Sequence, residues 1–220
     1  MNTLPNEKAR AARIENFALI FIVFALIWGS MTLLQVQCVA PYIIVNICLL
    51  LASRTMLKRD YGADIFRPRH AKRQLLLGAA FGALMFLQAF LILLLIAAVF
   101  PISISIFPWL GVGWTAERIA LYVASSALMQ LAASYAEEAF WRQYCWRALE
   151  DAGLPGGAVL LVTTLIFALG HKPGASWLSV AIIGLLGLEF GLLRVKYGEG
   201  SFLLTGTAHF TYNILYTFIM

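Results

Sequence analysis

Charged residues are scarce in this chain of 220 amino acids: 12% are Asp, Glu, Lys or Arg, whereas 61% are hydrophobic. A soluble globular domain carries about 25% charged residues, so the composition argues against that class. Runs almost free of charge occupy residues 17–53, 75–117, 154–171 and 201–220. Because crossing the hydrocarbon core of a bilayer takes about 20 apolar residues, these runs predict an integral membrane protein.

Cysteine is also rare, and the three residues Cys38, Cys48 and Cys145 are odd in number and form no CxxC pair. This argues against a disulfide framework and against a thiolate zinc site; we interpret the three as small packing residues. The chain has no repeat, linker or low-complexity segment that would separate two domains. We therefore expect one membrane domain over residues 1–220.

The apolar runs predict an all-α fold, a polytopic bundle of about seven transmembrane helices. Their expected ranges are 17–34, 38–53, 75–100, 119–147, 156–171, 176–195 and 201–219. The first is longer than a usual signal-peptide core and no small-residue cleavage pattern follows it, so we expect it to remain in the membrane. Two GxxxG patterns, Gly78 to Gly82 and Gly187 to Gly191, indicate close packing of helices.

The net charge of +5 could indicate nucleic-acid binding, but the basic residues cluster between apolar spans, as the positive-inside rule requires. With the N-terminus in the cytoplasm, fourteen of the sixteen Lys and Arg residues fall on the inner side. Seven of these lie at residues 54–74, which we expect on the cytoplasmic surface against anionic lipid. The uncharged segment 101–114 is expected at the opposite interface. The lipid bilayer, not nucleic acid, is the expected partner.

Ionisable side chains inside a bilayer are costly and indicate function by default. The C-terminal half concentrates them, together with one amide: Glu137, Glu138, Arg142, His171, Glu189, His209 and Asn213. Glu138 and Arg142 are four residues apart, which predicts an ion pair on one helix face. His209 and Asn213 have the same spacing, so their side chains face the same way.

Counting residues back from the expected turns relates neighbouring helices. Glu137 and His171 are equally far from the turn at residues 153–157, so an antiparallel pair places them side by side. The same count from the turn at residues 197–200 predicts that Glu189 lies at about the same level along the helices as His209.

A carboxylate beside an imidazole can hold and deprotonate water, and a second imidazole with an amide can stabilise an oxyanion. This chemistry requires neither a metal nor a covalent nucleophile. Ser134 precedes Glu137 by three residues, but no GxSxG nucleophile elbow is present.

Three short patterns occur in order on the expected helices: EExxxR from Glu137 to Arg142, FxxxH from Phe167 to His171, and HxxxN from His209 to Asn213. Together they resemble the CPBP family of prenyl-protein (CAAX) endopeptidases and bacteriocin-processing or immunity proteins, also called Abi proteins. The resemblance covers about residues 119–217, which would form the catalytic core.

The resemblance implies an intramembrane glutamic endopeptidase without a cofactor. Glu137 and His171 would activate water, and His209 and Asn213 would stabilise the oxyanion. Glu138 and Arg142 correspond to the remaining positions of the first pattern, as supporting residues.

The chain ends soon after HxxxN, whereas prenyl-protein endopeptidases typically have a further helix. We therefore expect a bacterial member of the inner membrane. Its substrate would be a peptide or membrane-associated protein, cut near the membrane anchor.

Other interpretations remain open. Glu137, His171 and His209 could form the zinc site of a membrane metallopeptidase, although no HExxH is present. The chain could be a non-catalytic immunity or scaffold protein. Intramembrane Glu and His also serve proton-coupled transporters, which usually show an internal repeat, and this chain has none.

Overall fold

A computed structural model describes residues 40–55, 61–62, 65, 68, 70–101, 104, 107, 113–172, 175–198 and 201–219. Within these ranges the regular secondary structure is helical throughout, without strands. The expected helix at 17–34, much of the basic segment and most of the segment 101–114 lie outside the described residues.

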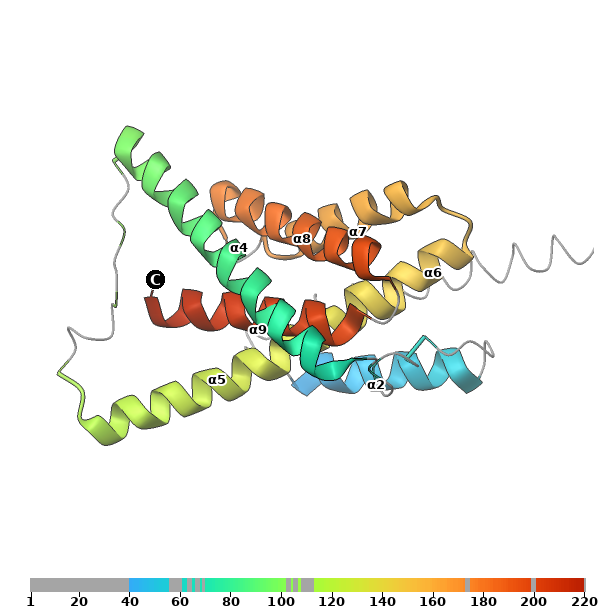
Figure 1. Ribbon diagram of the computed structural model, residues 1–220, viewed down its shortest axis with the longest axis horizontal. Coiled ribbons are helices and arrows are strands. Elements are labelled where there is room, and N and C mark those ends of the chain that lie inside the picture. The colour runs from blue at the N-terminus through green and yellow to red at the C-terminus, as the bar shows by residue number, and fades with distance from the viewer. Residues whose placement is uncertain are drawn as a thin grey trace, which may run out of the picture.

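The described helices follow the expected ranges closely (Figure 1). They are α2 (Ala40–Thr55), α4 (Ala71–Val99), α5 (Ala116–Glu138), the π-helix η2 (Ala139–Cys145), α6 (Trp146–Asp151), α7 (Gly156–Gly170), α8 (Trp177–Tyr197) and α9 (Phe202–Ile219). The π-helix was not predicted. Helix α4 begins four residues earlier than expected, so Lys72 and Arg73 belong to its first turn. Long basic side chains can occupy the end of a membrane helix because their charged tips reach the interface.

Three helical rods in the described part of the chain are long and apolar enough to cross a membrane. They are α4, the continuous 36-residue rod from Ala116 to Asp151, and α8. Helix α7 is apolar but only 15 residues long, and the count of seven spans stays a prediction. Large apolar side chains such as Leu84 and Leu95 are 60% and 70% exposed.

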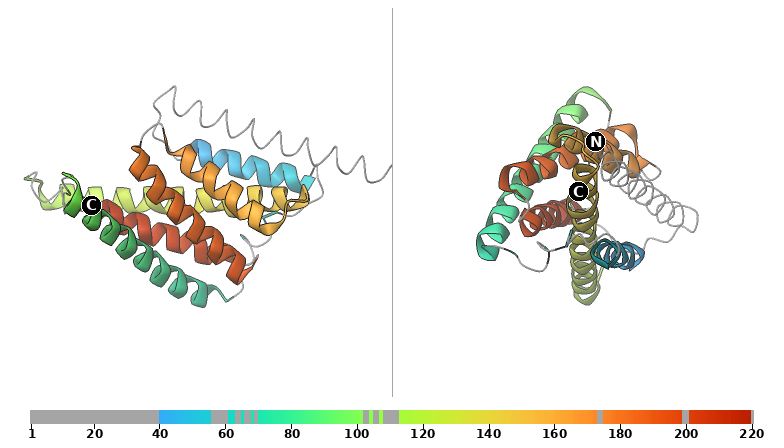
Figure 2. Two further views of the ribbon diagram at one scale, coloured as in Figure 1. Left: turned by 90° about the horizontal axis from the view of Figure 1, so that it is seen from above. Right: turned by 90° about the vertical axis from the view of Figure 1, so that its right-hand side faces the viewer.

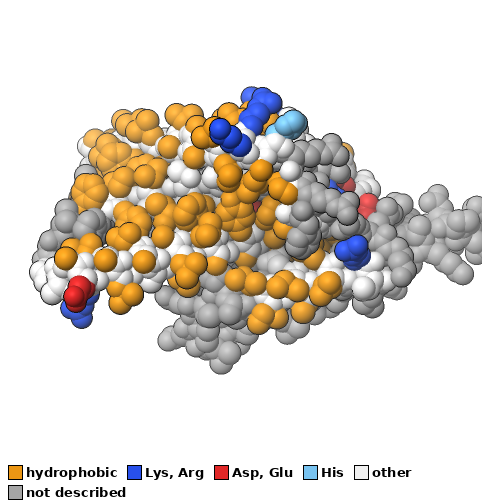
Figure 3. All heavy atoms as spheres, turned by 60° about the horizontal axis from the view of Figure 1, so that its bottom comes forward, with side chains coloured by type: hydrophobic (Ala, Val, Ile, Leu, Met, Phe, Trp, Pro, Cys, Tyr) orange, Lys and Arg blue, Asp and Glu red, His pale blue; other side chains and the backbone are white. Residues whose placement is uncertain are grey.

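Hydrophobic side chains cover most of the described part of the face in Figure 3, with charged ones near its edges. An exposed apolar surface of this extent is typical of contact with lipid. The protein is an integral membrane helical bundle.

Helix α9 lies between α4 and α5 (Figures 1 and 2). Glycines allow α4 to approach it closely: a Cβ atom on Gly78 would meet the backbone oxygen of Leu204, and one on Gly82 would meet that of Ala208. The predicted role of this GxxxG pattern in packing is confirmed.

The second GxxxG pattern, Gly187 to Gly191, allows α8 to pack closely against α7. Gly187 lies against the ring of Phe167, and Gly191 lies against Leu160. The two glycine patterns therefore bring α4 and α7 close to the helices that carry polar residues.

We predict that Gly82→Val will destabilise the protein because its side chain has no space at the α4–α9 crossing. Overpacking costs about 1–3 kcal/mol, which should appear as a lower melting temperature in detergent. Ala83→Val is the matched control, since Ala83 is the next residue and is exposed. Equal melting temperatures for the two variants would show that the close approach of α4 to α9 is wrong.

Candidate active site

A cavity of about 420 Å³ opens among α4, α5, α7, α8 and α9. The four residues that the sequence analysis predicted to be catalytic all line this cavity: Glu137, His171, His209 and Asn213. Apolar side chains such as Leu93, Ile182 and Leu186 form much of the remaining wall. The fold thus brings residues from all three sequence patterns to one cavity inside the bundle.

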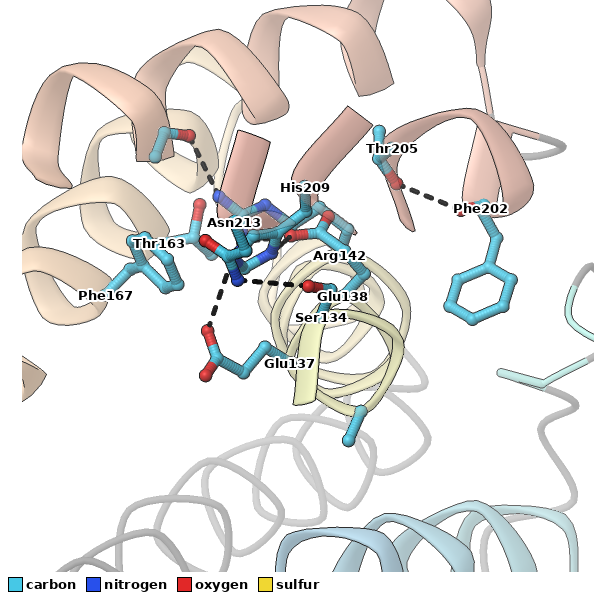
Figure 4. Close-up of polar contacts among 12 residues, drawn as sticks. Ser134, Glu137, Glu138, Arg142, Thr163, Phe167, Phe202, Thr205, His209 and Asn213 are labelled. Atoms are coloured by element: carbon cyan, nitrogen blue, oxygen red, sulfur yellow. Dashed lines mark hydrogen bonds and ion pairs between the residues drawn. The ribbon is translucent and has the colours of Figure 1, made fainter. Parts of the chain in front are cut away.

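Glu138 lies behind this cavity, where it is completely buried. Its Oε1 atom accepts a hydrogen bond of 3.0 Å from Nη1 of Arg142, which confirms the predicted pair. The same oxygen lies 3.0 Å from Nδ1 of His209 on α9. Figure 4 shows this arrangement, and the contact with His209 was not predicted.

Arg142 is almost fully buried, with a side chain that is 1% exposed. Nη2 donates to the backbone oxygen of Gly187 at 3.0 Å. The guanidinium carbon lies 4.8 Å from the ring centre of Phe167 and 5.4 Å from that of Phe190. Such cation–π contacts stabilise a cation that has left water, so Arg142 connects η2 to α7 and α8.

The orientation of His209 follows from its partners. The carboxylate of Glu138 accepts hydrogen bonds, so Nδ1 of His209 carries a proton. Phe190 stacks on the ring, with centroids 4.7 Å apart and an interplanar angle of 27°. Nε2 is then turned toward Glu137, 3.9 Å from its Oε2 atom.

His171 has a different partner. Its Nδ1 lies 2.8 Å from the backbone oxygen of Phe167, one helical turn earlier. A carbonyl oxygen only accepts, so Nδ1 is the donor and Nε2 of the neutral ring keeps a free lone pair. Phe167 therefore supplies a carbonyl for His171 and a ring for Arg142, two roles that the sequence did not reveal.

The remaining polar residues divide between the site and its surroundings. Nδ2 of Asn213 donates to Oγ of Ser134 at 3.1 Å, a contact that sequence reasoning missed. Glu189 lies on α8 beside Gln88 of α4 and is not among the described residues that line the cavity. Within the ranges that the structure describes, no three His, Cys, Asp or Glu residues are grouped to hold a metal ion.

Comparison with known protein families gives a match in the C-terminal half of the chain. The model of the family described as type II CAAX prenyl endopeptidase Rce1-like matches residues 119–215. Residues 119–215 are therefore similar to the Rce1-like family. The match contains all three sequence patterns and confirms the predicted resemblance. No curated protein and no solved structure matches the chain.

The similarity to a family of CAAX prenyl endopeptidases indicates a membrane peptidase. The elements that form the described cavity, apart from α4, lie almost wholly within the matched region. The Rce1-like region is therefore also the part of the fold that encloses the candidate site.

Within the Rce1-like region, we predict that Glu138→Gln will destabilise the fold. Arg142 would keep its charge in a buried position without a counter-ion, which costs about 3–5 kcal/mol. Thermal unfolding in detergent would measure the loss, and adding Arg142→Met should recover most of it. Glu117→Gln is the control, because Glu117 is exposed at the start of α5. A Glu138→Gln protein as stable as the wild type would contradict this account of the pair.

Proposed function

We propose that the protein is an intramembrane glutamic endopeptidase that hydrolyses a peptide bond in a membrane-associated protein or peptide. The observation that carries this proposal is that Glu137, His171, His209 and Asn213 line one and the same cavity. The match to a prenyl endopeptidase family supports it. The catalytic core would be residues 119–217 of one membrane domain, in a bacterial inner membrane with the N-terminus in the cytoplasm.

In this proposal, Glu137 and His171 activate the water molecule. With its Nδ1 proton engaged by a carbonyl, neutral His171 can accept a hydrogen bond from water at Nε2. Glu137 takes a proton as the water oxygen bonds to the scissile carbonyl carbon. When the C–N bond breaks, the same proton passes to the departing amine nitrogen, so that Glu137 is regenerated.

The oxyanion would be stabilised by His209 and Asn213. Nδ2 of Asn213 has two N–H groups and gives one to Ser134, which leaves one for the substrate. His209 can donate from Nε2 only as an imidazolium, because Nδ1 already carries a proton. Glu138 Oε1 lies 3.0 Å from Nδ1 of this ring and Glu137 Oε2 lies 3.9 Å from Nε2. Donors fixed in place before the reaction are the most effective kind.

The apolar part of the cavity wall suits a substrate that arrives from the bilayer. Leu93, Ile182, Leu186 and Tyr212 surround the polar groups, an arrangement typical of sites that bury apolar substrate and orient it with few polar contacts. We propose that the scissile bond lies close to the membrane anchor of the substrate.

The experiment compares Glu137→Gln with wild type on two fluorogenic peptides in lipid vesicles. One peptide is farnesylated and ends in a CAAX sequence, and the other is its unmodified counterpart. Glu137→Gln keeps the side-chain volume but removes the base. We expect normal melting and a turnover lower by about 100-fold or more.

Glu189→Gln is the matched control, since it removes another intramembrane carboxylate away from the cavity lining. This variant should keep wild-type turnover. A folded Glu137→Gln protein with near-normal turnover would overturn the role of Glu137. Failure of the folded wild type to cleave either peptide would overturn the endopeptidase proposal. Loss of wild-type cleavage after chelation, restored by zinc, would favour the metallopeptidase alternative.

A further inference from the structure

Helices α5 and α9 run antiparallel and are joined by a regular series of polar contacts. Each step moves four residues forward on α5 and four back on α9. We call this series the α5–α9 ladder; its rungs are Gln130 with Thr217 at 3.1 Å, Ser134 with Asn213 at 3.1 Å, and Glu138 with His209 at 3.0 Å. A spacing of four is close to one helical turn, so the rungs follow one line along the interface.

The rungs differ in their relation to the cavity. His209 and Asn213 line it, whereas Gln130 and Thr217 are not among the described lining residues. Ser134 is completely buried and is likewise absent from the described lining. The hydrogen bond to Asn213 therefore links the Ser134 hydroxyl to the cavity.

We propose that Ser134 is a positioning residue, which holds the Asn213 carboxamide so that its second N–H faces the reacting carbonyl. This inference rests on the proposed peptidase function. The carboxamide turns about a broad terminal torsion with two similar minima. In the opposite orientation Oδ1 would face the cavity, where an acceptor would repel the developing negative oxygen. The rotation would break the hydrogen bond from Nδ2 to Ser134, and the hydroxyl would have to turn before it could donate to Oδ1 instead.

Burial strengthens the constraint. The Ser134 side chain has no exposed surface, so water cannot replace Asn213 as its partner without entering the helix interface. A buried polar group that loses its hydrogen bond is penalised by its desolvation. The amide is thus held before substrate arrives, as an oxyanion donor requires.

The test compares two variants that each remove one hydroxyl acceptor from the ladder. Ser134→Ala removes the rung at Asn213, and Thr217→Val removes the rung one turn away from the site. With the farnesylated fluorogenic peptide, Ser134→Ala should lower kcat about tenfold. This is less than the decrease in kcat of about 10²–10³-fold that follows the loss of a whole oxyanion donor. KM should stay within about twofold, because the effect arises in the transition state.

Thr217→Val should keep wild-type kcat, although both variants should lower the melting temperature to a similar extent. If Ser134→Ala does not fold, Ser134→Cys replaces it, since sulfur is a weak acceptor of similar size. In an Asn213→Ala background, Ser134→Ala should change kcat by less than about twofold, because the two residues act as a unit.

Three results would overturn the positioning role: wild-type kcat in folded Ser134→Ala, an equal kcat loss in Thr217→Val, or an undiminished effect of Ser134→Ala without Asn213. In each case the wild type would still cleave the peptide and the proposed function would stand. An inactive but folded wild-type protein would instead overturn the proposed function, and the role of Ser134 with it.

Discussion

One buried carboxylate oxygen holds the site together. Oε1 of Glu138 accepts from Arg142 within its own helical rod and from His209 on α9. A charge inside a membrane protein is very costly unless it is paired and hydrogen-bonded, so Glu138 and Arg142 depend on each other. Arg142 in turn needs the carbonyl of Gly187 and the ring of Phe167. Five helical elements, α5, η2, α7, α8 and α9, are thereby fixed around one ion pair.

This constraint separates the two adjacent glutamates. Neighbouring residues on a helix point about 100° apart, so Glu138 can face the ion pair while Glu137 faces the cavity. The π-helix η2 begins immediately after Glu138 and contains Arg142. A wide turn of this kind is rare and occurs frequently at functional sites. Here the π-helix carries Arg142, the ion-pair partner of Glu138, and Glu138 in turn orients His209.

Much of this arrangement could be predicted from the sequence. Apolar runs located the described helices, and the four-residue spacing of Glu138 and Arg142 predicted their pair. The π-helix was missed because seven residues are too few to show its period.

The α5–α9 contact was missed because turn counting relates only helices that are neighbours in the chain. A signal for it was present: polar residues recur every fourth position in two otherwise apolar helices, at Gln130, Ser134, Glu138 and Arg142, and at Thr205, His209, Asn213 and Thr217. Polar residues that repeat on one face of a membrane helix indicate contact with another helix.

The central claim is that Glu138 accepts a hydrogen bond from Nδ1–H of His209, and histidine nitrogen-15 NMR of the protein in lipid tests it most directly. The chain has only three histidines, and a His209→Ala sample identifies the signal. The account predicts that Nδ1 of His209 is protonated in the wild type and that this signal shifts in Glu138→Gln. An Nδ1 without a proton, or a signal unchanged by Glu138→Gln, would contradict it.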